Sequence, residues 1–349
     1  MGYKLAARRF LESAAGAPAR KILRARRRGP VVFFLHGVEE KITDPVIQFL
    51  QLKLPEFERL IGHLRSNYEI VPLDALRDWL KGKNRLGAEH CLLSFDDGYR
   101  NNLTTVAPLL ASFSVPFSVF VSTGNVTSGE RFPGYHLNLI LNRTEQKFYR
   151  SRLLGRSFDL GTVEKRKQAV MDVWRIMLKL NLAGVRLLEQ ELFELIPAGR
   201  LAELDQEFSS EQPLNWVEVE KIVALGATIG SHTRDHAVLH AGEDPAETER
   251  QLFESKAELE RRLGNCRYLS WPNGSRADVS PAAVRLAKNA GYELAFSTVM
   301  GDIGRDSPPL ALPRIGGSAD LALLESNLSL APLYSWRCRR WSSQLCRSV

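Results

Sequence analysis

The sequence is poor in cysteine and has no long apolar run. Its 349 residues include only four cysteines, none of them in a close metal-like cluster, so disulfide bonds are not required. No apolar run approaches the roughly 20 residues that cross a membrane. The N-terminus also lacks the apolar core of a secretion signal and carries Arg8, Arg9 and Glu12 where that core would be. These absences predict a cytoplasmic protein.

Acidic residues are almost absent from both ends of the chain. Residues 1–28 hold nine Lys or Arg and one acid, and residues 331–349 hold four Arg and no acid. Because the whole chain carries +7, residues 29–330 carry a net charge of −5. A nucleic-acid-binding face on the core is therefore not indicated. We expect one domain over residues 29–330 between two basic tails, which are either solvated or hold the protein peripherally on an anionic membrane surface.

Apolar runs and helical periodicity alternate along most of the chain, which predicts an α/β fold with a parallel sheet. The strands are expected at residues 31–36, 68–73, 91–96, 117–122, 227–231, 267–271, 293–297 and 310–315. Residues 131–213 interrupt this alternation, because they read as helices without convincing strands. We expect an insertion there that serves as a lid, as a substrate-binding wall or as packing elaboration.

Three short polar segments follow expected strands. The apolar run at residues 91–93 leads into SFDDG at 94–98, and HTRDH at 232–236 begins 135 residues after Asp97. A third segment, WPNG at 271–274, ends another strand in a turn. Parallel strands in a (β/α) barrel place such residues at one rim. Two imidazoles and one carboxylate form a common hydrolytic metal shell with positions open for water and substrate.

In order and spacing, these segments resemble the motifs of the NodB-homology polysaccharide deacetylases, carbohydrate esterase family 4. The resemblance covers roughly residues 29–318 and implies a deformed (β/α)7–8 barrel. It implies a hydrolase of linear amide bonds that removes N-acetyl groups from an amino sugar in a polysaccharide, an oligosaccharide or a lipid-linked glycan. Two alternatives remain open. One is a deformylase or other N-deacylase of a lipid-linked sugar, and the other is an inactive carbohydrate-binding or membrane scaffold.

Carried over residue by residue, the resemblance makes Asp97, His232 and His236 the ligands of one divalent metal ion and Asp96 the general base. Zinc is the first expectation for the metal, and cobalt, nickel and iron can share such ligands. The cation would polarise the amide carbonyl and keep the neighbouring carboxylate ionised, so that the carboxylate can accept a proton from water. A backbone N–H near Asn273 would help to hold the developing oxyanion.

The sequence departs from the family pattern at two places. The usual arginine of the third motif is absent, since Ser270 and Trp271 occupy that stretch, and no histidine follows His240 to act as the general acid. We expect Arg314 to substitute for the arginine. The acid that protonates the leaving amine is then expected to be His36, at the end of the first strand, with His136 as the alternative.

Contacts to the glycan substrate are expected mainly from the third segment. The indole of Trp271 either flanks the apolar face of a pyranose or packs in the core. The expected substrate contacts are Trp271, Pro272, Asn273, Gly274 and Arg314.

Overall fold

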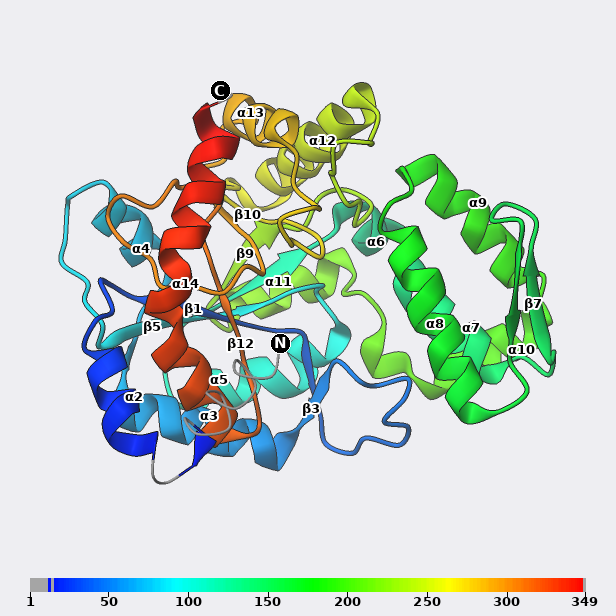
Figure 1. The fold of residues 1–349 in the computed structure, drawn as a ribbon, viewed down its shortest axis with the longest axis horizontal. Helices are drawn as coiled ribbons and strands as arrows, with labels where there is room; N and C mark the ends of the chain where they lie inside the picture. The colour runs from blue at the N-terminus through cyan, green and yellow to red at the C-terminus, as the bar shows by residue number, and fades with distance from the viewer. Residues whose placement is uncertain (1–11, 14–15, 348–349) are drawn as a thin grey trace.

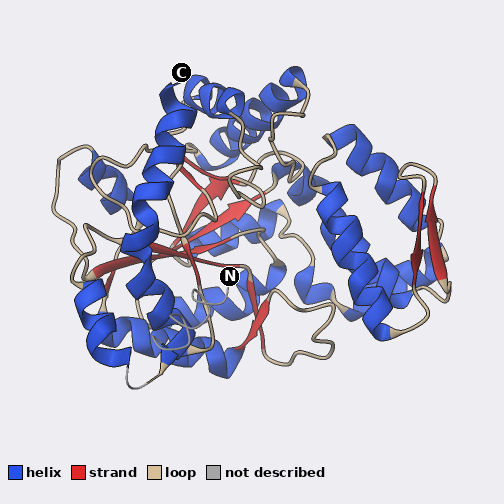
Figure 2. Ribbon diagram, in the orientation of Figure 1, coloured by secondary structure: helices blue, strands red, loops and turns tan. Residues whose placement is uncertain are grey.

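A curled parallel sheet forms the centre of the molecule (Figures 1 and 2). The computed structural model describes residues 12–13 and 16–347. The strands of this sheet are β1 (Val31–Leu35), β4 (Glu69–Ile70), β5 (His90–Phe95), β6 (Phe117–Val121), β9 (Ala227–Ser231), β10 (Tyr268–Ser270), β11 (Leu294–Phe296) and β12 (Ile315–Gly316). They run in the order β11-β10-β9-β6-β5-β1-β12, with β4 paired to β5, and every pairing is parallel. A strand lies in or overlaps each of the eight expected positions.

Residues 309–316 bring the two edges of the sheet together. The backbone N–H of Ala295 in β11 donates to Pro309, and the N–H of Leu312 donates back to Ala295. A few residues later, Ile315 pairs with Phe33 of β1. Because one short segment bonds to β11 and then to β1, the sheet closes into a deformed barrel. The predicted α/β fold class is confirmed.

Helices cover the outside of the barrel, and most of them turn an apolar side toward the core. The longest between strands, α12, starts where the Asp244 side chain accepts hydrogen bonds from two backbone N–H groups, and ends at Gly264 with φ 82°. The helices around the barrel are α3 (Leu54–Asn67), α4 (Leu73–Leu80), α5 (Ala107–Ser112) with η2 (Asn102–Val106) before it, α6 (Thr123–Ser128), α11 (Trp216–Ala224), α12 (Pro245–Leu263) and α13 (Pro281–Ala290). A short parallel pair, β2 (Gly37–Glu39) and β3 (Gln51–Lys53), follows β1.

The expected insertion forms a lobe beside the barrel with its own apolar core (Figure 1, green). It consists of α7 (Pro133–Arg143), β7 (Phe148–Ser151), β8 (Arg156–Asp159), α8 (Val163–Met177), α9 (Leu182–Phe193), α10 (Ala198–Glu207) and η3 (Ser209–Glu211). The prediction that this stretch contains no strands is wrong, because β7 and β8 form an antiparallel hairpin. Four residues per strand give only two alternations each, which is too short a pattern to identify from sequence.

The two segments expected as basic tails both contain helix. Helix α2 (Ala17–Arg24) lies within residues 1–28 and contacts α14 (Leu321–Arg347). Since α14 continues through residue 331 and through Pro332, the expected boundary at residue 330 falls inside a helix. Among the residues that the structure describes, no helix combines the length and the apolar character needed to span a bilayer.

Candidate active site

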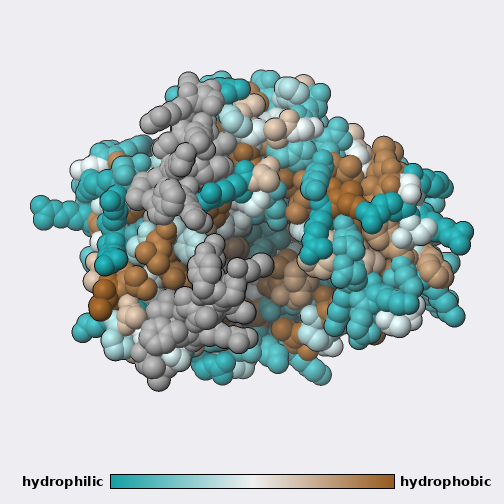
Figure 3. All heavy atoms as spheres, viewed as in Figure 1, coloured by the Kyte–Doolittle hydropathy of each residue, from teal (hydrophilic) through white to brown (hydrophobic). Residues whose placement is uncertain are grey.

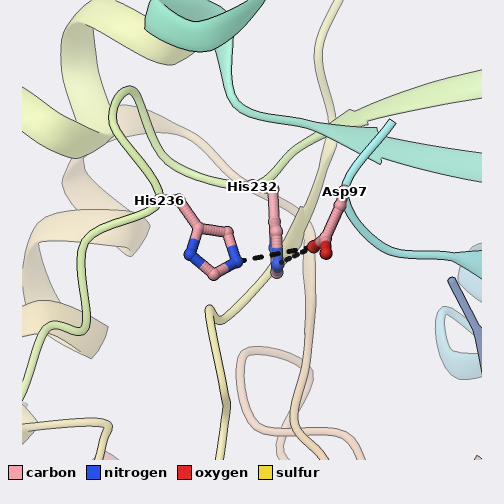
Figure 4. A group of neighbouring side chains, drawn as sticks. All are labelled: Asp97, His232 and His236. Atoms are coloured by element: carbon pink, nitrogen blue, oxygen red, sulfur yellow. Dashed lines mark ion pairs between the residues drawn. The ribbon is translucent and has the colours of Figure 1, made fainter. Parts of the chain in front are cut away.

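Asp97, His232 and His236 meet at the C-terminal rim of the barrel (Figure 4). The Nε2 atoms of His232 and His236 lie 3.3 and 3.4 Å from Oδ1 of Asp97. The three potential ligand atoms lie within 4.8 Å of one another, and Asp97 and His232 are buried. One carboxylate and two imidazoles at this spacing fit a divalent metal ion that keeps positions open for water and substrate. The residues present therefore fit the metal that the sequence suggests.

Strand β6 aligns the segments that carry these side chains. It lies between β5 and β9, and its Phe120 and Val121 carbonyls accept hydrogen bonds from the backbone of Asp97 and His232. The backbone has positive φ at Asp97 (131°) and at His236 (54°). Non-glycine residues in such regions cost about 1–3 kcal/mol each and persist where the surrounding structure holds them. The strain is therefore concentrated where the candidate ligands are presented.

A hydrogen bond to the backbone of β10 fixes the ring of His232. Its Nδ1 donates to the carbonyl of Ser270 at 2.7 Å, which leaves the Nε2 lone pair directed toward Asp97 and the other ligands. Burial alone would raise the pKa of Asp97, but hydrogen bonds with His232 and His236 hold that pKa well below its usual range. Burial also lowers the pKa of His236, which favours the neutral imidazole that a metal needs.

Arg314 binds the carboxylate of Asp96 through two parallel hydrogen bonds. Its Nη1 lies 2.8 Å from Oδ1, and its Nη2 lies 2.6 Å from Oδ2. Burial raises the pKa of Asp96, but the charge of Arg314, followed by that of His232, lowers it below the usual value. The Asp96 carboxylate is therefore ionised at neutral pH. The expectation that Arg314 contacts substrate is wrong, because its side chain has no exposed surface. Its guanidinium already donates hydrogen bonds to Asp96, Ser94, Ser270 and the Ser297 carbonyl.

His36 ends β1 beside these carboxylates. Its positive charge is among the influences that lower the pKa of both Asp96 and Asp97, and its ring stays partly exposed. The Asn102 side chain donates to the His36 carbonyl at 2.8 Å and fixes the backbone there. His36 thus follows the C-terminal end of β1, within electrostatic reach of both carboxylates. His136 is elsewhere, with its Nδ1 2.6 Å from a Glu189 oxygen inside the insertion.

The third segment is largely buried. Trp271 is 1% exposed and its indole N–H donates to the Leu310 carbonyl, so the prediction that it contacts substrate is wrong and its core-packing alternative holds. Pro272 and Gly274 are also buried, so neither residue offers a surface to a ligand. Asn273 is partly exposed, has φ 57° and lines a small cavity together with His236. Of this segment, Asn273 is the residue that borders open space beside the site.

Two aromatic residues that the sequence did not single out border the candidate ligands. Burial, followed by the charge of Asp97, raises the pKa of the Tyr99 hydroxyl, so the two side chains lie close together. The Tyr99 ring packs edge-on against Phe132 with 5.9 Å between centroids. The Phe132 ring lies 4.7 Å from that of His236. Tyr99 directly follows the SFDDG segment and could have been noticed, whereas Phe132 belongs to the start of the insertion. The insertion therefore contacts the site itself.

A polar cleft runs between the insertion and the barrel. It has a volume of about 710 Å³ and is lined by side chains of α6, α9 and α12, among them Asn125 and Arg186. Asp235, Pro133 and Leu182 line both this cleft and the small cavity beside His236, so the two spaces adjoin. On the face shown in Figure 3, the surface is visibly hollowed between the barrel and the insertion. The site is thus bordered by room for a ligand larger than one acyl group.

Comparison with known proteins agrees with this geometry. Residues 192–295, which include both histidines of the candidate metal centre, match the family model for polysaccharide deacetylases. The match covers less than a third of the chain and shows that this segment is similar to the family. The resemblance that the motifs indicate is confirmed.

The chain is also similar to one curated protein and to solved structures. Poly-beta-1,6-N-acetyl-D-glucosamine N-deacetylase of Escherichia coli (strain K12) is 30% identical over 89 residues, which is 25% of this chain and 13% of that protein. The Streptococcus pyogenes deacetylase PplD, solved with acetate, superposes with a TM-score of 0.54 at 13% identity over 90% of this chain and 99% of its own. IcaB from Ammonifex degensii gives 0.54 at 17% identity over 87% and 98%. These two structures support the fold of the domain.

Proposed function

We propose that this protein is a metal-dependent hydrolase that removes N-acetyl groups from an amino sugar of a glycan. The observation that carries the proposal is the convergence of Asp97, His232 and His236 beside an ionised Asp96 that is held by Arg314. The names of the relatives support the same reaction class, since the Escherichia coli protein is named for N-deacetylation of poly-beta-1,6-N-acetyl-D-glucosamine. The adjoining cleft supports a glycan with more than one sugar.

A divalent cation held by the three ligands would supply Lewis-acid polarisation of the amide carbonyl and the attacking water. Zinc is our proposal for this cation because its catalytic sites take three protein ligands of these types. Asp96 accepts the proton that the water loses, and its lowered pKa keeps it in the required basic form. Arg314 fixes the orientation of Asp96 through both carboxylate oxygens. We assign the oxyanion donor to the backbone N–H of Asn273, because Asn273 lines the same small cavity as His236.

The nitrogen of the sugar leaves as an amine and must gain a proton as the C–N bond breaks. We assign that proton to the imidazolium of His36, which enters the site from β1, on the far side of Asp96 from β6. The carbon–oxygen bond to water forms first and the carbon–nitrogen bond then breaks, so that acetate and a free amino sugar result. An inactive scaffold would not require this combination of candidate ligands, base and arginine partner.

Two measurements on the purified chain test the proposal together. Metal analysis should find one divalent ion for each chain, and a panel of N-acetylated and N-formylated amino sugars should release acetate in preference to formate. A chelated sample should lose the activity and regain it when zinc, cobalt or nickel is added back. A chain that binds metal but releases only formate would support the deformylase alternative. Absence of both metal and acid release would support the scaffold.

A further inference from the structure

Three arginines gather on the face of the barrel opposite to the candidate ligands. Arg28, Arg85 and Arg305 line a surface hollow of about 550 Å³. Arg28 precedes β1 and Arg85 precedes β5, so the hollow lies at the N-terminal ends of these strands, whereas Asp97 follows the C-terminal end of β5. A strand of this length spans roughly 17 Å. The hollow and the metal site therefore open on opposite faces of one barrel.

The hollow is positively charged and its cations are exposed. Asp306 is the acid that lines it, at 3.7 Å from Arg28. Arg305 is fixed by hydrogen bonds to the carbonyls of Trp79 and Asn84, so its charge is not neutralised. Within the part of the chain that the structure describes, the Arg85 side chain makes no hydrogen bond or ion pair. The hollow therefore presents more positive than negative charge to solvent.

Helix α2 brings apolar surface to the same end of the barrel (Figure 1, dark blue). Ile22 is 61% exposed, Lys21 beside it is exposed, and the chain continues from α2 through exposed Arg26 to Arg28. Helix α2 rests on α14, where Leu333 is 44% exposed. Exposed apolar side chains among cations are typical of helices that lie in the headgroup region of a bilayer.

We propose that α2 and the arginine hollow together form a docking face for an anionic membrane surface, with lipid phosphates in the hollow and Ile22 among the headgroups. A dissolved anion would satisfy the arginines but would leave Ile22 in water, so the face as a whole fits a bilayer. The charge of the sequence agrees, since residues 1–28 carry nine cations and one acid. The metal site then faces away from the bilayer. This inference does not depend on the proposed reaction.

Vesicle co-sedimentation of the full chain tests the docking face. The chain should sediment with phosphatidylcholine vesicles that contain phosphatidylglycerol, and should not sediment with phosphatidylcholine alone. Added salt should release it, because exposed charges are screened. The triple variant Arg28→Gln, Arg85→Gln and Arg305→Gln should bind about 100-fold more weakly, as expected for three cations near a charged surface. Ile22→Ser should weaken binding further.

A matched triple variant in the insertion controls for charge alone. Arg152→Gln, Arg175→Gln and Arg200→Gln also removes three exposed cations and should leave vesicle binding unchanged. Metal content and acetate release from a soluble substrate should stay at wild-type levels in both triples. If the hollow triple fails to fold, Arg85→Glu alone supplies the test, since this exposed side chain holds no other residue. The docking face would be overturned if both triple variants lost vesicle binding equally, or if the full chain did not bind vesicles. It would also be overturned if the full chain bound inorganic phosphate but no vesicles.

Discussion

The guanidinium of Arg314 meets the carboxylate of Asp96 edge to edge, although 218 residues separate them along the chain. Both oxygens of Asp96 are engaged, and both partners are buried. In the deacetylase motifs that the sequence resembles, an arginine of the third segment pairs with the catalytic aspartate. In this protein, the segment just before β12 supplies the pairing from another part of the sheet.

Replacing Arg314 should therefore impair both folding and the reaction. Arg314→Gln leaves a buried carboxylate without its partner and should cost about 3–5 kcal/mol of unfolding free energy. Arg314→Lys keeps a positive charge but loses the paired geometry, so it should fold and show reduced turnover. Because the pKa of Asp96 rises without the guanidinium, the acid limb of the pH–rate profile should move to higher pH. Denaturant unfolding and pH–rate profiles measure these effects. The control is Arg152→Gln, which removes an exposed ion pair with Glu194 and should cost less than about 1 kcal/mol of unfolding free energy.

Removing a ligand should remove the metal. His232→Ala or His236→Ala leaves two of the three protein ligands, so stoichiometric binding should be lost in each variant. Metal analysis of dialysed protein measures the result. Full occupancy in both variants would show that the ion is held elsewhere.

Asp96→Asn should separate catalysis from metal binding. The amide cannot accept a proton from water, so turnover should fall to background while metal content stays at one ion for each chain. Acetate release and metal analysis on the same preparation measure both properties. An active Asp96→Asn enzyme would exclude Asp96 as the base.

His36→Ala should lose about 100- to 10,000-fold in turnover on N-acetyl sugars, which is the usual contribution of a general acid. An acetyl ester with a phenolate leaving group does not need that proton, so its hydrolysis should change little. His63→Ala is the control, because His63 pairs with Glu325 on the outside of the barrel. Equal losses on both substrates would assign His36 a structural role instead.

Tyr99→Phe should weaken metal binding by about 10- to 100-fold, as is typical when an outer-shell partner of a ligand is removed. The variant keeps the ring against Phe132 but loses the buried hydroxyl that lies near Asp97. Competition with a chelator measures the affinity without any need for activity. Tyr149→Phe removes a similar buried hydroxyl inside the insertion, where it bonds to Glu191, and should leave the affinity unchanged.

Glu211 should make the protein less stable as the pH rises. Burial raises the pKa of this carboxyl to about 7, with Glu39 contributing, so the folded state holds a proton that the unfolded chain releases above about pH 4.3. The stabilisation by this group is present in acid and is lost as the pH rises through about 7. The unfolding free energy should fall by about 3 kcal/mol over that range. Glu211→Gln should therefore gain stability relative to wild type between pH 5 and pH 8 in denaturant unfolding.

Glu191→Gln provides a control of opposite sign. The pKa of Glu191 is lowered, because hydrogen bonds from Ser151 and the Leu153 backbone outweigh the effect of burial. Its contribution to stability is present at neutral pH and is lost in acid. The unfolding free energy of Glu191→Gln should thus fall further below that of wild type as the pH rises. The same trend in both variants would exclude the assigned difference in pKa.

The strands of the central sheet and the three polar segments were predictable from sequence because they are encoded locally. An apolar run that ends in Asp-Asp-Gly, or in a histidine turn, specifies a buried strand and the residues at its rim without information from elsewhere. The parallel arrangement then brings these rims together, so the two carboxylates and the two histidines could be grouped before the structure was known. The choice of Asp97 as the ligand came from the resemblance to the deacetylase motifs.

Other relationships depend on which distant segments become neighbours. The pairing of Arg314 with Asp96 requires that the end of the sheet return to β1. The contact of Phe132 with His236 requires the insertion to fold back on the rim. From the sequence, Trp271 could face a sugar or the core. The tertiary structure decided for the core, because it buries the ring and bonds the indole N–H to the Leu310 carbonyl. Local residue patterns determined what each segment forms, whereas long-range packing and charge pairing determined which side chains reach the site.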